Sequence, residues 1–290
     1  MPVCNKKRYI GITLTQIYIM KFDYEINKIH KDTAVCFIQK YHYSPMMPRH
    51  NIHPLGYFLD GKLKGVLTLG WGTQPEGTIN KMFSGLKTNH YYEIGKMCLS
   101  PELNKTDAGS QMLSATIRWM KRNTNCLFLY TLADGMMGKC GYVYQASNFY
   151  YGGNYSTQVY QLSNGIKIHP QSKEARKLIE KNEIQDNKDK RFGEFVKRFR
   201  LSYEFMEENG IRKIGANMFR YIYPLNKKAK SLMKLSSNLI WNKTNYPKDK
   251  DLVWRDETDN KNKTLIERPV FSFENANHKI SGASLESFFI

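Results

Sequence analysis

The chain has 290 residues, 41% of them hydrophobic and 13% aromatic, which is enough for a sizeable core and excludes wholesale disorder. No run of about 18 apolar residues occurs, so no membrane span is expected. The formal net charge of +18 indicates a polyanionic partner, although a merely soluble basic surface would give the same composition. The five cysteines are odd in number and lack Cys-x-x-Cys spacing, which argues against disulfides or a zinc finger and favours a reducing cytoplasm.

The first part of the chain predicts a strand or leader, a helix, a hairpin and a strand. Residues 1–25 have a basic start and an apolar middle with polar interruptions, typical of a first strand or a poorly ordered leader. Apolar residues at helical spacing predict an amphipathic helix over 26–41. Asp60-Gly61 between two apolar runs predicts a hairpin, and residues 91–101 read as a further strand.

The next part alternates helix and strand. Residues 104–122 predict a helix, and residues 126–134 form an apolar strand that ends at Asp134. A turn rich in glycine and tyrosine, a short helix and a strand over 156–168 follow. This order predicts a mixed α/β (α+β) domain with a central mixed sheet, largely consecutive in strand order, flanked by helices.

Composition changes beyond residue 170. Residues 170–215 are rich in Lys, Glu, Asn and Phe at helical spacing, and they predict a basic helical insertion within a domain that spans 26–240. Residues 219–225 return as a strand with strong β-formers. Residues 241–290 are polar with little periodicity and predict an extended tail.

Four separated motifs carry a family resemblance. They are Tyr-His-Tyr-Ser (41–44), Glu-Ile-Gly-Lys-Met-Cys-Leu-Ser-Pro (93–101), Ala-Asp followed by Gly-Tyr-Val-Tyr-Gln-Ala-Ser-Asn-Phe (133–149), and Phe-Arg-Tyr-Ile-Tyr-Pro-Leu (219–225). In this order they resemble the signature of phage Mom-like proteins, which modify adenine and are built on a Gcn5-related N-acetyltransferase (GNAT) scaffold. The similarity covers roughly residues 26–165 and 216–235.

The resemblance implies a GNAT-like fold and a transferase. The expected reaction moves a small acyl-type group, methylcarbamoyl-like, to N6 of adenine in double-stranded DNA, which protects phage DNA from restriction in the host cytoplasm. The family scaffold implies acetyl-CoA or a related acyl donor, held by a Gln/Arg-x-x-Gly-x-Gly/Ala loop that corresponds to residues 104–110. Only part of that pattern is present, and Asp107 adds a negative charge. The donor residues implied are Met97, Leu99, Gly109 and Ser110.

Three polar side chains are candidates for the chemistry. His42, at a helix end, can accept a proton or bind a metal, unless it only bonds a backbone carbonyl. Glu93 is expected on one strand face with Gly95 and Met97, where it can act as a base or orient an amine. Asp134 ends a strand at the edge where open α/β sheets bind ligands, although a lone Asp there is often a turn former. The resemblance favours a catalytic Asp134, accepting a hydrogen bond from adenine N6–H.

Tyrosines are the other expected site residues. Their rings can stack on a flipped base, and a phenol can protonate a leaving group, although ordinary packing is the alternative. Tyr43 and Tyr144 are the catalytic tyrosines implied by the resemblance. The expected substrate and DNA contacts are Tyr142, Gln145, Asn148, Tyr151, Arg220, Tyr221, Lys190, Arg191 and Arg198.

The sequence also admits a metal site and two alternative functions. His50 and His53 form a His-x-x-His pair in a loop, and together with His42 and Asp134 they would supply ligands for iron or zinc. One alternative function is a GNAT acetyltransferase acting on a small amine or a protein. The other is a non-enzymatic DNA-binding protein with the same fold.

Overall fold

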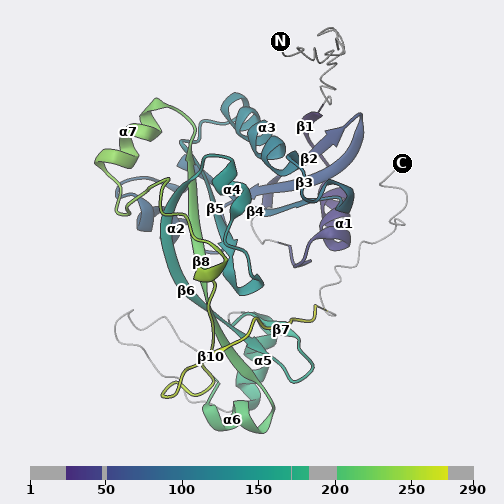
Figure 1. The fold of residues 1–290 in the computed structure, drawn as a ribbon, viewed down its shortest axis with the longest axis vertical. Helices are drawn as coiled ribbons and strands as arrows, with labels where there is room; N and C mark the ends of the chain where they lie inside the picture. Colours follow the sequence, from purple (N-terminus) through teal and green to yellow (C-terminus); the bar gives the residue numbers. More distant parts are fainter. Residues whose placement is uncertain (1–23, 48–50, 171, 183–200, 274–290) are drawn as a thin grey trace, which may run out of the picture.

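A computed structural model describes residues 24–47, 51–170, 172–182 and 201–273 (Figure 1). The helices are α1 (Lys31–Tyr41), α2 (Pro75–Met82), α3 (Ala108–Asn123), α4 (Tyr142–Ala146), α5 (Lys173–Asn182), α6 (Tyr203–Glu208) and α7 (Lys227–Leu235). The strands are β1 (Tyr24–Lys28), β2 (Asn51–Leu59), β3 (Lys62–Gly70), β4 (Tyr91–Leu99), β5 (Phe128–Asp134), β6 (Tyr150–Gln161), β7 (Lys167–Ile168), β8 (Arg212–Pro224), β9 (Trp254–Asp256) and β10 (Thr264–Ile266).

The strands form one mixed sheet in the order β1-β2-β3-β4-β5-β8-β6-β7, with β9 on β8 and β10 on β9. β4 and β5 pair in parallel, whereas the other pairs are antiparallel. The predicted mixed α/β class is therefore confirmed. The strand order is consecutive as far as β5, and then β8 enters between β5 and β6.

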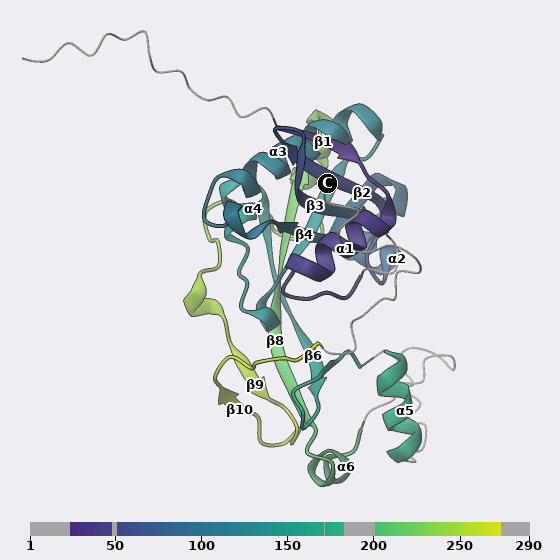
Figure 2. The same cartoon turned by 90° about the vertical axis from the view of Figure 1, so that its right-hand side faces the viewer.

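Helices cover both faces of the sheet. α3 packs on one face through a cluster that includes Met112 and Leu113, whereas α1 packs on the other face through Phe37 and Ile38. Figure 2 shows α3 and α1 on opposite sides of β2–β4. On the face of α1, α2 and α7 cover a third cluster around Phe128. Both faces are thus protected from water, as the apolar β5 sequence requires.

The predicted hairpin is confirmed, and its turn explains its sequence. Asp60 (φ 49°) and Gly61 (φ 74°) are both in the left-handed region, as a two-residue type I′ turn requires. The helix expected over 26–41 is wrong in its first turn, because residues 24–28 form β1 and pair with β2. Tyr24 and Ile26 alternate with polar residues and pack on the core, which is strand periodicity.

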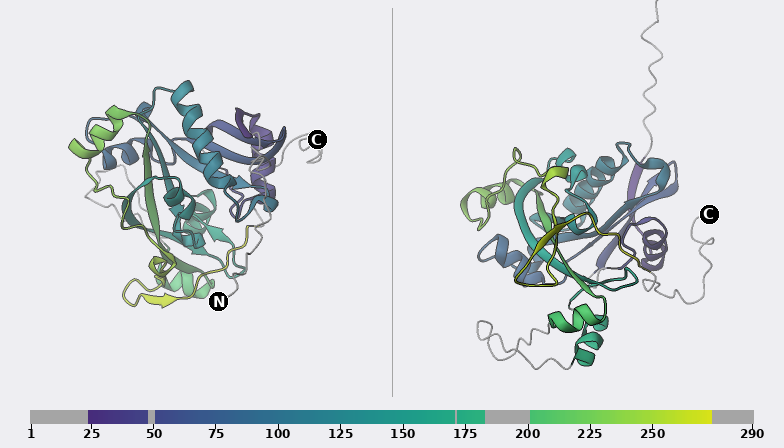
Figure 3. Two further views of the ribbon diagram at one scale, coloured as in Figure 1. Left: turned by 45° about the horizontal axis from the view of Figure 1, so that its top comes forward. Right: turned by 60° about the horizontal axis from the view of Figure 1, so that its bottom comes forward.

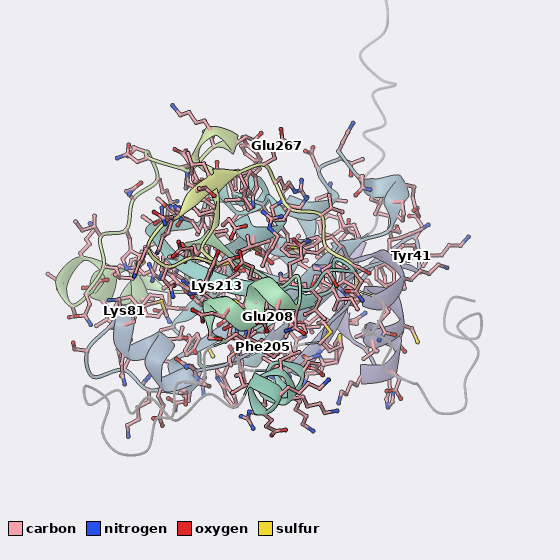
Figure 4. The ribbon with its side chains drawn as sticks, turned by 90° about the horizontal axis from the view of Figure 1, so that it is seen from below. Tyr41, Lys81, Phe205, Glu208, Lys213 and Glu267 are labelled. Atoms are coloured by element: carbon pink, nitrogen blue, oxygen red, sulfur yellow. The ribbon has the colours of Figure 1, made fainter. Side chains whose placement is uncertain are left out.

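The long strands β6 and β8 carry a lower extension of the molecule. Their far ends pair with each other beyond the end of β5, and α5 and α6 pack beside them in a cluster of their own (Figures 1 and 3). Figure 4, seen from below, places Phe205 and Glu208 of α6 near Lys213 of β8. The two helices agree with the predicted helical insertion, but β8 starts at Arg212, seven residues before the predicted strand.

The prediction of an extended tail over 241–290 is wrong for residues 241–273. Trp241 stacks on Phe83 with ring centroids 6.5 Å apart, and β9 pairs with β8. Trp254 donates a hydrogen bond from Nε1 to the carbonyl of Met136 at 3.2 Å. Widely spaced aromatic residues anchor this segment without any periodic pattern. Residues 274–290 lie outside the described part of the chain.

Within the described residues, no helix combines the length and apolarity needed to cross a bilayer. Cys36, Cys98 and Cys126 are buried free thiols in the core, as expected, and Cys140 is also free and buried.

Candidate active site

A cleft opens where β4 and β5 separate. The two strands pair only as far as Ile94 and Thr131, although both continue beyond that point. The resulting cavity has a volume of about 640 Å³. Side chains from four separate segments line it: Tyr41–Tyr43 at the end of α1, Glu93–Leu99 of β4, Leu132–Asp134 of β5 and residues 138–144, together with Asn104, Gly109, Met218 and Asp249.

A β-bulge in β4 decides which side chains share a face. Thr68 of β3 pairs with Lys96 and the next residue, Leu69, pairs with Ile94, so Gly95 is the extra residue. The expectation that Glu93 and Met97 share a face is therefore wrong. Met97 packs toward α3, whereas Glu93 and Lys96 lie on the opposite face. A one-residue insertion reverses the alternation of a strand, and the sequence pattern gave no sign of it.

Glu93 is a carboxyl group without a compensating cation. Burial raises its pKa to about 7, and among the described residues no ion pair to it is found. Gly72 makes room for this side chain, because a Cβ there would lie within 3.0 Å of all three carboxyl atoms. A carboxyl with this pKa exchanges a proton near neutral pH, which suits a general base.

His42 and Lys96 are joined through Ser44. His42 Nδ1 lies 2.9 Å from the carbonyl oxygen of Ser44 and 3.0 Å from its amide nitrogen. Lys96 Nζ donates to the same carbonyl at 2.8 Å. Burial, followed by the charges of Lys96 and Lys139, lowers the pKa of His42 to about 3. His42 is thus neutral and a weak base, which favours a positioning role over the predicted role as proton acceptor.

Asp134 lies at the carboxyl end of β5, as predicted, and its two oxygens have different contacts. Oδ1 accepts a hydrogen bond from the Met137 amide at 3.3 Å, which is the turn-forming role. Oδ2 lies 3.9 Å from Lys167 Nζ. Burial lowers the pKa of Lys96 to about 8, while Asp134 opposes that shift. Asp134 therefore also supplies the negative charge between two partly buried ammonium groups.

Tyr43, Tyr142 and Tyr144 all line the cleft. Tyr43 is 43% exposed and Tyr142 is 50% exposed, so both rings are accessible at its mouth. Burial raises the pKa of the Tyr144 phenol, and burial, with Asp134 second, raises that of Tyr43. Both phenols are therefore protonated at neutral pH and able to donate a hydrogen bond or a proton.

Gln145 and Tyr221 support the cleft from outside it. Gln145 Nε2 donates to Tyr221 Oη at 3.0 Å and to the Pro247 carbonyl at 2.9 Å. Tyr221 is fully buried and its hydroxyl donates to the carbonyl of Cys140. Gly141 has a φ of 93°, and a Cβ there would lie 2.6 Å from the Tyr221 ring. The predicted DNA contact of Tyr221 is therefore wrong in this structure, because the ring packs under the turn.

Three further expected DNA contacts, Asn148, Tyr151 and Arg220, are not among the residues that line the cleft. Asn148 has a φ of 62° and is a turn residue, and Tyr151 packs 5.6 Å from Tyr221. The Arg220 guanidinium lies 4.5 Å from the Tyr155 ring and donates to a backbone carbonyl on β6. The structure does not describe His50, Lys190, Arg191 and Arg198.

The described members of the predicted metal set, His42, His53 and Asp134, do not come together. His42 and Asp134 both line the cleft, but His53 bonds Tyr92 Oη at 3.3 Å and packs on Trp119. The described residues contain no group of three or more side chains suited to hold a metal ion. The ammonium groups beside His42 also repel a cation. The described residues do not fit an iron or zinc centre.

Three of the four residues predicted to bind the acyl donor meet at one end of the cleft. Gly109, in the first turn of α3, lies against α4, where a Cβ would be 3.0 Å from Val143 Cγ2 and 3.7 Å from Met97 Cε. Met97 and Leu99 line the same end. Ser110 instead donates its hydroxyl to the Asp107 carbonyl at 2.8 Å. A helix N-terminus that lines a cleft, as that of α3 does at Gly109, is suited to an anionic group.

The structure therefore defines a mixed α/β protein with titratable side chains around an open cleft, at the point where two parallel strands separate. The model of the Mom protein family matches residues 23–248, and the chain belongs to that family. One relative, described as methylcarbamoylase mom of Escherichia phage Mu, is 26% identical over 231 residues, covering 78% of this chain and 86% of the relative.

Among solved structures, the chain is similar to several acetyltransferases. An N-acetyltransferase from Staphylococcus aureus Mu50 is 12% identical with a TM-score of 0.37, covering 70% of this chain and 99% of that one. An acetyltransferase from Bacillus subtilis in complex with CoA is 12% identical with a TM-score of 0.34, covering 71% and 100%. A GNAT family N-acetyltransferase from Escherichia coli, also with CoA, has a TM-score of 0.33 at 9% identity, covering 44% and 69%. Because each TM-score is below 0.5, the fold class rests on the sheet order and connections described above.

Proposed function

We propose that this protein transfers a small acyl-type group, methylcarbamoyl-like, to the exocyclic N6 of adenine in DNA and so protects that DNA from restriction. Membership of the Mom family and the methylcarbamoylase relative support a transferase of this kind. The observation that carries the proposal is Glu93, a carboxyl group with a pKa of about 7 and no paired cation, inside a cleft with protonated tyrosines.

The proposed step needs one base and one acid. N6 attacks the carbonyl carbon of the acyl donor, so that an N–C bond forms and the bond to the leaving group breaks. Glu93 accepts the proton that N6 loses. Tyr144 or Tyr43, both protonated, supplies a proton to the departing group, and solvent later restores it. The donor is of the acyl-CoA class, with the α3 N-terminus and Gly109 at its end of the cleft.

Adenine N6 is a weak nucleophile, because its lone pair is delocalised into the ring. Asp134 lies at the opening edge of β5, where its carboxylate can accept a hydrogen bond from N6–H and localise that lone pair. The base must leave the duplex to reach this position. The exposed rings of Tyr43 and Tyr142 at the mouth of the cleft offer it flat surfaces.

Expression with a plasmid tests the proposal directly. The plasmid DNA is digested to nucleosides and analysed by mass spectrometry, and we expect a modified deoxyadenosine with the wild-type protein and none with Asp134→Ala. Folding of the variant is checked by circular dichroism. Unmodified DNA from well-expressed wild-type protein that still binds DNA tightly would instead favour the non-enzymatic DNA-binding alternative.

A further inference from the structure

A basic strap, residues 226–251, consists of α7 and the segment that runs from α7 to the rim of the cleft. It contains seven lysines and two aspartates, and no other charged residue. In Figure 1 it leaves α7 and crosses in front of the strands toward α4. Its path is fixed by hydrogen bonds from the Tyr151 amide to the Asn242 carbonyl at 2.8 Å and from Gln145 to the Pro247 carbonyl at 2.9 Å.

One face of α7 presents three aligned lysines. Lys227, Lys230 and Lys234 are spaced i, i+3, i+7, so they lie along one side of the helix, and all three are exposed. Ala229 on the inner side is fully buried. The helix sequence KKAKSLMKL has no acidic residue that would neutralise this face.

The lysines of the strap lack carboxylate partners. In the described parts of the chain, none of the seven forms an ion pair. Lys243 and Lys248 instead lie over tyrosine rings, 4.5 Å from the centroid of Tyr150 and 5.3 Å from that of Tyr142. Lys243 also lies close enough to Lys230 for burial and that like charge to lower its pKa. Like charges held together in this way favour the binding of a polyanion.

We propose that the basic strap is the surface on which the phosphate backbone of duplex DNA lies. Lys227, Lys230 and Lys234 contact phosphates, and Lys248 brings the strand to the mouth of the cleft beside Tyr142. The idea rests on the proposed function, since it assigns the surface that presents DNA to that site. The strap ends at the cleft itself, because Asp249 is one of the lining residues.

Two other surfaces fit a polyanion less well. The lysines of α5 share their helix with Glu174 and Glu180, and α6 has three glutamates in six residues. A membrane surface would require a continuous outward apolar face on α7. Leu235 and Ile240 are exposed, but Ala229, Leu232 and Met233 pack toward the core, so α7 presents a single apolar side chain beside its lysines rather than such a face. Duplex DNA is therefore the partner that the strap favours.

A pair of charge-matched variants of the full-length protein tests the inference. Lys227→Gln/Lys230→Gln/Lys234→Gln removes three charges from α7, and Lys173→Gln/Lys177→Gln/Lys181→Gln removes three from α5, where all three lysines are also exposed. Binding to a fluorescent duplex is measured between low and moderate salt. The α7 variant should bind about tenfold or more weakly at low salt, with a salt slope shallower by about 3, while the α5 variant keeps the wild-type slope.

The outcomes separate this inference from the proposed function. Equal losses of DNA affinity in both variants, or wild-type DNA binding by the α7 variant, would overturn the assignment of the strap as the DNA-binding surface. Loss of binding to anionic phosphatidylserine vesicles with unchanged DNA binding would overturn it too. If the wild-type protein modifies no adenine but the α7 variant alone loses DNA affinity, the strap stands and the proposed function fails. Thermal melts of both variants confirm folding, and Lys248→Gln provides a single-site check at the mouth of the cleft.

Discussion

Glu93 and Asp134, two carboxyl groups that line the cleft, differ in their charged surroundings. Among the described residues Glu93 has no ion-pair partner, and burial raises its pKa to about 7. Asp134 lies 3.9 Å from Lys167 and opposes the lowering of the Lys96 pKa by burial, and burial also lowers the pKa of Lys167. The surroundings of Glu93 favour proton exchange, whereas those of Asp134 hold charges in fixed positions. A general base must exchange its proton, whereas an orienting carboxylate must keep its charge, so opposite environments suit the two roles.

The largest expected effect is the loss of the base. Glu93→Gln keeps the shape of the side chain but cannot accept a proton, so the rate of adenine modification should fall about 10²–10⁴-fold. The rate is measured as modified deoxyadenosine formed with time. Glu102→Gln is the control, because Glu102 is exposed and paired with Lys64. If the Glu93→Gln variant modified adenine at a rate within a few-fold of wild type, another group would have to be the proton acceptor.

A smaller loss of activity is expected when Asp134 is changed. Asp134→Asn leaves Lys96 and Lys167 without their carboxylate and should slow modification by up to about a hundredfold, because the substrate amine is misoriented. Since Asp134 opposes the lowering of the Lys96 pKa, the alkaline limb of the pH profile should also move to lower pH. Slower modification with an unmoved limb would mean that Asp134 serves only as a turn former.

The pH profile of the wild-type protein should show the ionisation of both Glu93 and Lys96. Activity rises toward pH 7 as Glu93 loses its proton, and it falls above about pH 8 as Lys96 loses its charge and its hold on Ser44. Lys96→Gln should lower activity and flatten the alkaline limb while leaving the acid limb in place. An acid limb near pH 4.5 would show that Glu93 has an ordinary pKa and is not buried as described.

The smallest effect concerns stability. Between about pH 4.5 and 7 the folded protein keeps a proton on Glu93 that the unfolded chain releases, so stability falls as the pH rises through this range. Glu93→Gln should therefore be about 1–3 kcal/mol more stable than wild type at pH 8. Its melting temperature should rise by a few degrees there. The difference in stability should disappear near pH 4. A variant less stable than wild type at pH 8 would contradict the description of Glu93 as a buried carboxyl group without a paired cation.

Local sequence signals predicted the elements that depend on neighbours in the chain. Asp60-Gly61 specifies its own turn, α3 follows from helical spacing, and the strand ending at Asp134 appears where expected. The bulge at Gly95 could not be predicted, because it depends on the pairing of β4 with β3. The faces of Glu93 and Met97 were wrong for that reason.

Contacts between distant segments account for the other errors. Lys167 reaches Asp134 from a two-residue strand, and sequence spacing gave no sign of that contact. Lys139 adds to the charge beside His42, and a single lysine in a glycine-rich turn carries no sequence signal for that contact. Residues 241–251 of the strap were predicted as part of an extended tail, since isolated aromatic anchors such as Trp241 and Tyr246 leave no periodic pattern.

The hydrogen bond from Gln145 to Pro247 joins residues 102 positions apart. β8 likewise enters the sheet between β5 and β6, both of which precede it in the chain. During synthesis most of the lining of the cleft therefore emerges long before β8 and the strap, which add Met218 and Asp249 to it. Contacts between residues so far apart in the sequence form slowly. Until β8 has been synthesised, the edge of β5 is open to pairing with other chains. Assembly of the cleft is thus a late folding event, and an incomplete chain exposes a sheet edge prone to aggregation.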